Sequence, residues 1–227
     1  MLGKGQVKMD YNEKGIEALQ NKEYEKAIGA FLQAVEENPS DAVGYINVGN
    51  VFASVGDTEK AERFFQKAIT LDEGAGTAIY GLANLYYNEE RYEEAAKLYE
   101  QAIRKGIEEA DAYFMLGKSL ERSEQVKLAL PYLQRAAELA PTDIEIRLSY
   151  GILLANLEVF EEAGKEFRYV IERDVNHADA QYNLGFLYAV STERKEDALY
   201  HLKQAFTLDP AYEQARYIYD MIQLGEQ

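Results

Sequence analysis

The side chains best suited to acid–base or metal chemistry are few and poorly spaced for it. His177 and His201 are the two histidines of the 227-residue chain. They lie far outside the i, i+4 spacing that lets two histidines on one helix face share a metal ion. The chain has no cysteine, which excludes disulfides, iron–sulfur clusters and thiolate zinc sites. We therefore expect structural or surface histidines, with no metal and no cofactor.

Two short patterns resemble catalytic motifs only superficially. Gly3-Lys4-Gly5 lacks the glycine spacing, the following Ser or Thr and the preceding strand of a phosphate-binding loop. The carboxylate pairs Glu36-Glu37 and Glu161-Glu162 are typical of a solvated helix face. No nucleophile–base combination and no cofactor motif is present, so the sequence predicts a protein that is not an enzyme.

Two amides are better placed for binding than for catalysis. Asn50 and Asn84 stand 34 residues apart, and each amide can donate and accept hydrogen bonds. Two amides with this spacing can form hydrogen bonds with the N–H and C=O groups of an extended peptide backbone. The alternative is two ordinary amides on a helix surface. The elements that carry the two side chains decide between these interpretations.

The chain repeats with that same period of 34 residues over six consecutive units. Four columns of similar residues stay in register, with a single one-residue insertion in the segment 191–198. The first column is small: Gly15, Gly49, Ala83, Gly117, Gly151 and Gly185. The second is alanine: Ala27, Ala61, Ala95, Ala129, Ala163 and Ala198. The third is bulky: Phe31, Phe65, Tyr99, Leu133, Phe167 and Leu202.

Each unit has the pattern of two helices joined by a tight turn. Apolar residues recur at i, i+3, i+4 and i+7, which predicts amphipathic helices. Gly56-Asp57-Thr58 has the composition of a helix stop followed by N-cap residues. Nothing alternates with a period of two, so strands are not expected. One such hairpin cannot bury its apolar face, whereas six stacked hairpins share a continuous core.

A 34-residue helix–turn–helix unit with these columns resembles the tetratricopeptide repeat family. The resemblance implies an all-α, right-handed superhelical solenoid of six repeats plus a C-terminal capping helix. The family's fourth-position aromatic is replaced by Ile79, Arg147 and Gln181. The expected organisation is a leader at 1–7, tandem repeats over 8–212 and the rest of the capping helix with a tail at 213–227. The six repeats are 8–41, 42–75, 76–109, 110–143, 144–177 and 178–212.

The capping helix is expected to begin near residue 211 and to have two different faces. Polar residues would face outward, and three apolar residues, Ile218, Met221 and Ile222, would cover the last repeat. A docking site for a partner is the alternative interpretation of the same helix. The polar residues are Glu213, Arg216, Asp220 and Gln223.

The resemblance also implies a concave groove, lined by the first helix of each repeat, that binds a peptide or a partner helix. Its lining positions carry an apolar strip, the two asparagines and a row of carboxylates. The family's clamp for the C-terminal carboxylate of a chaperone tail is disfavoured, since Ile46 and Tyr80 stand where its lysine is expected. The candidate peptide-binding residues are Ile46, Asn50, Tyr80, Asn84, Tyr87, Asp111, Phe114, Lys118, Glu145, Leu148, Ile152, Asp179, Tyr182 and Phe186.

Charge narrows the class of partner. Forty Asp and Glu against 24 Lys and Arg give a net charge of −16, which repels nucleic acid and anionic membranes. No signal segment or membrane span is recognisable, so a cytoplasmic protein is expected. The predicted function is a protein–protein interaction adaptor that binds a segment with basic and apolar residues. The alternative is a self-assembling structural module; a monomer is expected, with a homodimer as the other state.

Overall fold

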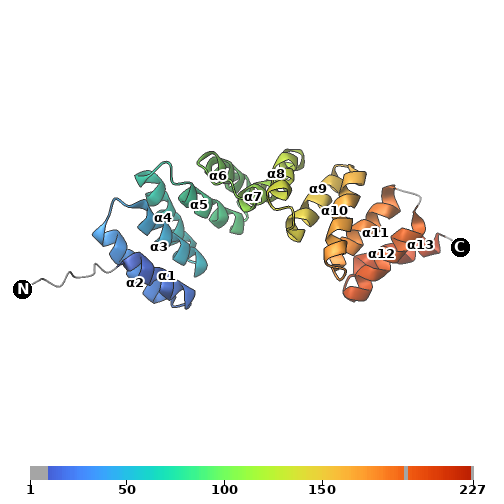
Figure 1. Cartoon of the computed structure of the whole chain (residues 1–227), viewed down its shortest axis with the longest axis horizontal. Helices are drawn as coiled ribbons and strands as arrows, with labels where there is room; N and C mark the ends of the chain where they lie inside the picture. The colour runs from blue at the N-terminus through green and yellow to red at the C-terminus, as the bar shows by residue number, and fades with distance from the viewer. Residues whose placement is uncertain (1–9, 192–193, 226–227) are drawn as a thin grey trace, which may run out of the picture. The chain divides into compact units, whose positions relative to one another are not determined.

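The computed structural model describes residues 10–191 and 194–225, which form thirteen helices and no strand (Figure 1). The predicted all-α fold of stacked helical pairs is confirmed. The predicted leader at 1–7 lies outside the described residues, and the repeat boundaries stay a prediction. Within the described ranges, no helix combines the length and the apolar character that a membrane crossing requires.

The helices alternate between first and second members of each pair. The first helices are α1 (Tyr11–Gln20), α3 (Ala42–Ser54), α5 (Gly76–Asn88), α7 (Ala110–Arg122), α9 (Ile144–Asn156) and α11 (Ala178–Ser191). The second helices are α2 (Tyr24–Glu37), α4 (Thr58–Leu71), α6 (Tyr92–Arg104), α8 (Val126–Leu139), α10 (Phe160–Arg173) and α12 (Lys195–Leu208). One further helix, α13 (Glu213–Leu224), packs on α12.

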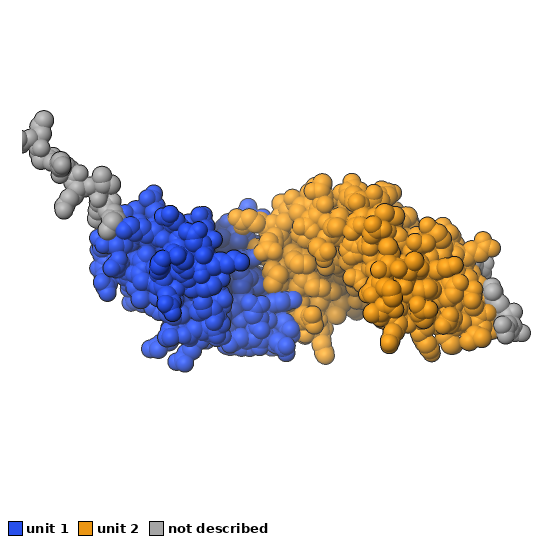
Figure 2. Space-filling model, turned by 90° about the horizontal axis from the view of Figure 1, so that it is seen from below, with its two compact units in different colours: residues 1–108 blue, residues 109–227 orange. Residues whose placement is uncertain are grey.

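The chain forms two compact units, divided after Glu108 (Figure 2). The first unit contains α1 to α6 and the second contains α7 to α13. In both units a helix packs against its partner in the pair and against the helix that follows. The core of each unit is therefore built from contacts that are local in sequence, as expected for tandem repeats.

The small and bulky columns meet inside each pair. All six bulky residues are at most 1% exposed, and all six column alanines are fully buried. A Cβ atom added to Gly49 would lie 2.9 Å from the Phe65 ring, and one added to Gly185 would lie 2.8 Å from the backbone nitrogen of Leu202. The side chain or backbone of the second helix thus occupies the space that a larger residue on the first helix would need.

Two of the three departures from the fourth-position aromatic keep the hydrogen bond that Tyr45 makes. In three pairs this side chain donates a hydrogen bond to the carbonyl six residues earlier, in the turn before the helix. Ile79, which has no donor, is instead fully buried. The three bonds are Tyr45 Oη to Pro39 O (3.2 Å), Arg147 Nε to Pro141 O (3.1 Å) and Gln181 Nε2 to Val175 O (3.3 Å).

Helix α13 differs from expectation at one residue. Ala215 is fully buried, and Ile218 and Ile222 pack with it against α11 and α12, as predicted. Met221, however, is 53% exposed, so its predicted role in covering the last repeat is wrong. The reason is helical geometry: residues 215, 218 and 222 share one face at i, i+3 and i+7, whereas Met221 shares another with Tyr217.

Replacing Gly185 with Ala should destabilise the second unit by about 1–3 kcal/mol, because the new methyl group meets the backbone of α12. Gly29→Ala is the matched control, since Gly29 lies in α2 with open space around it. That change should stabilise the protein by about 0.5–1 kcal/mol. Urea unfolding measures both effects; an equal gain in both variants would contradict the close approach of α11 and α12.

Candidate functional site

The candidate residues of the first unit are not equivalent. Asn50 is exposed, whereas the side-chain oxygen of Asn84 accepts a hydrogen bond from the Tyr99 hydroxyl at 2.5 Å. Tyr80 packs edge-on against the Tyr99 ring at 5.5 Å. Asn84 is thus fixed by the second helix of its own pair, and the two amides present different hydrogen-bonding capacity to a ligand.

Several members of the predicted apolar strip belong to the interior. Leu148 is buried in the core of the second unit, and Phe114 is half-buried against the cluster around Ala136. Tyr182 is 9% exposed because its ring stacks on Tyr212 at 4.9 Å and on Phe186 at 6.0 Å. These residues, together with buried Ile46, offer little surface to a ligand.

The remaining candidates of the first unit lie at helix surfaces that are partly covered. Tyr87, at the end of α5, packs edge-on against Tyr92 at 5.2 Å. Both Tyr80 and Tyr87 therefore present only part of their rings to solvent. The first unit offers a mixed surface of one exposed amide and two partly covered tyrosines.

The second unit has an open apolar hollow between α9 and α11. It measures about 230 Å³ and includes the predicted residues Ile152, Tyr182 and Phe186. Phe186 is 41% exposed at its edge. The sequence did not predict several of its residues. Val190 could have been predicted, because it is the thirteenth residue of its repeat, on the first helix. The other lining residues are Ala155, Asn156, Phe160, Asn183, Leu187 and Val190.

Exposed carboxylates recur at the N-terminal ends of the first helices of the second unit. Asp111, Glu145 and Asp179, at the start of α7, α9 and α11, are all exposed. The Tyr212 hydroxyl donates to Asp179 at 2.9 Å, and burial together with this carboxylate raises the pKa of Tyr212. The second unit thus has exposed negative charge on α9 and α11, the two helices that enclose the hollow, and on α7.

The one predicted cation, Lys118, is already paired. Its Nζ atom lies 2.9 Å from Oε2 of Glu121, and both side chains are mostly buried. That oxygen is buried, and the Lys118 ammonium is its charged partner. Lys118 therefore pairs with Glu121, and Glu145 has a contact of its own, because His177 Nε2 lies 3.7 Å from its Oε1.

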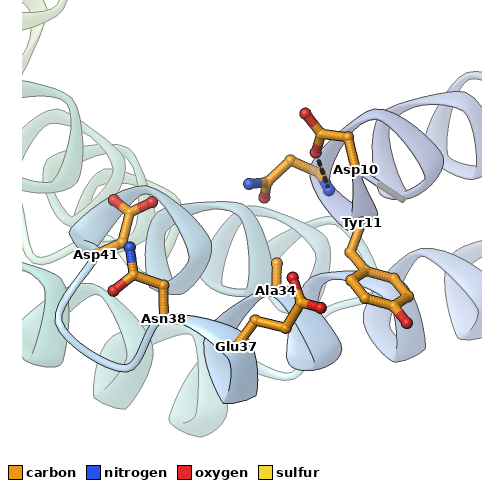
Figure 3. Close-up of a pocket in the computed structure, with 7 residues that line it drawn as sticks. Asp10, Tyr11, Ala34, Glu37, Asn38 and Asp41 are labelled. Carbon is orange, nitrogen blue, oxygen red and sulfur yellow. Dashed lines mark hydrogen bonds between the residues drawn. The ribbon is translucent and has the colours of Figure 1, made fainter. Parts of the chain in front are cut away.

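A second hollow, in the first unit, is acidic for a structural reason. It measures about 270 Å³ and lies among α1, α2 and the start of α3 (Figure 3). Asp10 Oδ1 accepts from the backbone N–H of Asn12 at 2.9 Å, and Asp41 Oδ1 accepts from that of Val43 at 3.0 Å. Both aspartates are N-caps that satisfy helix N–H groups, so the cluster needs no ligand to explain it.

The histidines have structural contacts. His177 Nδ1 accepts from the backbone N–H of Ala180 at 3.4 Å, in the first turn of α11. His201 Nδ1 lies 2.7 Å from Gln181 Oε1, and burial lowers the pKa of His201. In the described part of the chain, no three His, Asp or Glu side chains are grouped so as to hold a metal ion.

Comparison with known proteins gives consistent results. The family model described as the cilia and flagella-associated protein 70 C-terminal domain matches residues 15–185. A solved structure, titled "Crystal structure of YrrB: a TPR protein with an unusual peptide-binding site", is 45% identical with a TM-score of 0.80. It covers 84% of this chain, which covers 98% of that one.

Curated relatives share the repeats at lower identity. The photosystem I assembly protein Ycf3 of Acaryochloris marina is 31% identical over 138 residues, covering 59% of this chain and 70% of its own length. Human protein O-mannosyl-transferase TMTC3 is 30% identical over 195 residues, or 78% of this chain. The chain spans only 21% of the length of TMTC3.

The lowered pKa of His201 predicts a pH dependence of stability. The folded protein disfavours the imidazolium, so protons favour the unfolded chain once the pH falls below the ordinary value of 6.5. Stability from neutral His201 is complete above that pH and is lost below it. Between about pH 7.5 and 5.5, thermal unfolding should show a larger loss for the wild type than for His201→Gln.

The surroundings of His201 set the size of that effect. Asp197 raises its pKa, and Arg194 and Arg168 lower it, but burial is the largest influence. Asp197→Asn should therefore steepen the pH dependence that His201 confers. An identical pH profile for the wild type and His201→Gln would contradict this account of the repeat-six interior.

Proposed function

The chain belongs to the tetratricopeptide-repeat family, and we propose that it is a protein–protein interaction adaptor that binds a peptide or helix on its first helices. The family model covers most of the chain. YrrB, a TPR protein with an unusual peptide-binding site, is 45% identical to this chain. Binding, not chemistry, is therefore the activity that these residues support best.

The observation that carries the proposal is a hollow lined mainly by apolar side chains, in a unit whose first helices also carry exposed carboxylates. Ile152 and Phe186 line the hollow, and Asp111, Glu145 and Asp179 stand on the same first helices or their neighbour. An exposed apolar surface marks an interaction site, and charge complementarity selects the partner. The proposed ligand segment therefore contains Lys or Arg together with apolar residues.

An amide on a first helix could also bind the ligand backbone. Asn50 is exposed and can pair with peptide groups. This amide favours a ligand with polar groups over a purely apolar one.

Self-assembly is the second candidate function, because α13 has exposed apolar residues such as Tyr217 and Met221. The net charge of −16 opposes it, since two copies repel each other at low salt. Light scattering over a range of protein concentrations separates the two functions. A concentration-independent monomer supports the adaptor.

A labelled synthetic peptide of Lys and Leu tests the proposal by fluorescence polarisation. Exposed charge pairs are screened beyond about 8 Å at physiological ionic strength, so added salt should weaken binding. Asp111→Lys with Glu145→Lys should weaken it about tenfold, equal to about 1.4 kcal/mol.

The control is Glu172→Lys with Glu196→Lys, which changes the net charge equally at exposed sites on second helices. This pair should weaken binding far less. Equal losses from both pairs, or salt-independent binding, would contradict a specific acidic groove.

A further inference from the structure

Helix α13 has an exposed apolar face that its packing does not use. Tyr217 is 65% exposed, Met221 53% and Leu224 61%. Their i, i+4 and i+7 spacing places them on one side of the helix. Ala215 and Ile218, on another side of the helix, are the residues that pack α13 against the preceding repeat. We call Tyr217, Met221 and Leu224 the α13 stripe.

The residues of the α13 stripe occupy helix positions that can be compared with those of α11. Counted from the first residue of each helix, the stripe occupies the fifth, ninth and twelfth positions. On α11 the fifth and ninth positions are Tyr182 and Phe186, both lining the apolar hollow. The α13 stripe therefore repeats the positions of two residues that line the hollow, of which Phe186 is exposed and Tyr182 is covered by Tyr212.

The eighth position of α13 shows that this helix is not one more copy of a first helix that pairs with a second helix. There α11 has Gly185, whose missing Cβ makes room for Leu202 on its second helix. Helix α13 has Asp220, which is exposed. The face that would receive a second helix has thus become polar, while the fifth and ninth positions have stayed apolar. A helix that served only as a cap would need neither exposed Tyr217 nor exposed Met221.

The stripe is continuous with apolar surface on the neighbouring first helix. Helices α11 and α13 contact each other directly, and Tyr182 of α11 stacks on Tyr212 in the turn before α13. On α11, Phe186 is 41% and Val190 55% exposed. Helices α11 and α13 both pack on α12 and contact each other, so neighbouring helices both carry exposed apolar residues of the kind that an amphipathic helix binds.

The charges around this surface select the occupant. Asp179, Glu213 and Asp220 are exposed on the same two helices. Arg216 is directed elsewhere, with its guanidinium 4.6 Å from the Phe206 ring. A second copy of the chain would bring a net charge of −16 to this surface, whereas a basic partner would neutralise it.

We propose that the α13 stripe, together with Phe186 and Val190, forms a docking surface for a basic amphipathic helix of a partner protein. The proposal rests on the adaptor function above and specifies the form of its ligand. The apolar face of the partner helix lies along α11 and α13, and its Lys or Arg residues flank Asp179, Glu213 and Asp220. Helix α13 is then part of the binding site.

Two labelled peptides of about 18 residues and identical Lys and Leu composition test this. One places its leucines along a single helix face, and the other alternates Lys and Leu. Polarisation measures their affinities for the full chain and for three variants: Tyr217→Ser with Met221→Ser, Phe186→Ser, and Tyr200→Ser. Tyr200 is the matched control, 59% exposed on the second helix α12. Circular dichroism checks that each variant is folded.

The helical-pattern peptide should bind more tightly than the alternating one. The double α13 variant should lose at least about tenfold of that affinity, and Tyr200→Ser should lose none. If Phe186→Ser weakens binding and the double variant does not, the adaptor function stands and this proposal is overturned. If neither peptide binds the wild type, both fail. A concentration-dependent dimer abolished by the double variant would identify a second copy as the occupant and overturn the proposal.

Discussion

The structure depends on one contact, repeated in every helical pair, between a small residue on the first helix and a bulky residue on the second. Gly185 has no room for a Cβ beside the backbone of Leu202, and Gly49 has none beside the Phe65 ring. Each contact fixes the rotation of a helix about its own axis. With that rotation fixed, the fifth and ninth positions of α5, Tyr80 and Asn84, contact Tyr99 of the second helix. The same positions of α11, Tyr182 and Phe186, line the hollow. The candidate site is a consequence of the packing constraint.

The same constraint explains why the two faces of α13 have different chemistry. Asp220 occupies the position at which Gly185 meets its second helix, and it is exposed. Tyr217 and Met221 occupy positions that line the hollow in the preceding repeat, and they are apolar and exposed. A single rotation therefore accounts for both a polar face and an apolar one. The arrangement fits a helix that extends a binding surface more closely than one that only covers a core.

The helical pairs could be predicted from the sequence because the columns are themselves the packing contacts. The contacts and burial of individual side chains are harder to predict, because they depend on neighbouring residues outside the columns. Arg147 departs from the pattern, yet it donates to the turn carbonyl as Tyr45 does. Tyr182 is buried because Tyr212 stacks on it from a separate turn. Met221 is exposed because residues 215, 218 and 222 already define the buried face of α13, and Met221 shares another face with Tyr217.

The central claim is that the ligand-facing surface follows the first helices, from α9 through α11 to α13. Methyl chemical-shift mapping of the full chain, titrated with the helical Lys–Leu peptide, tests this most directly. Exposed apolar residues lie on both sides of the molecule's second unit, so the experiment contains its own controls. The account predicts shifts at Val190, Met221 and Leu224 and none at Leu128 or Val175. Shifts concentrated at Leu128 and Val175 would contradict it.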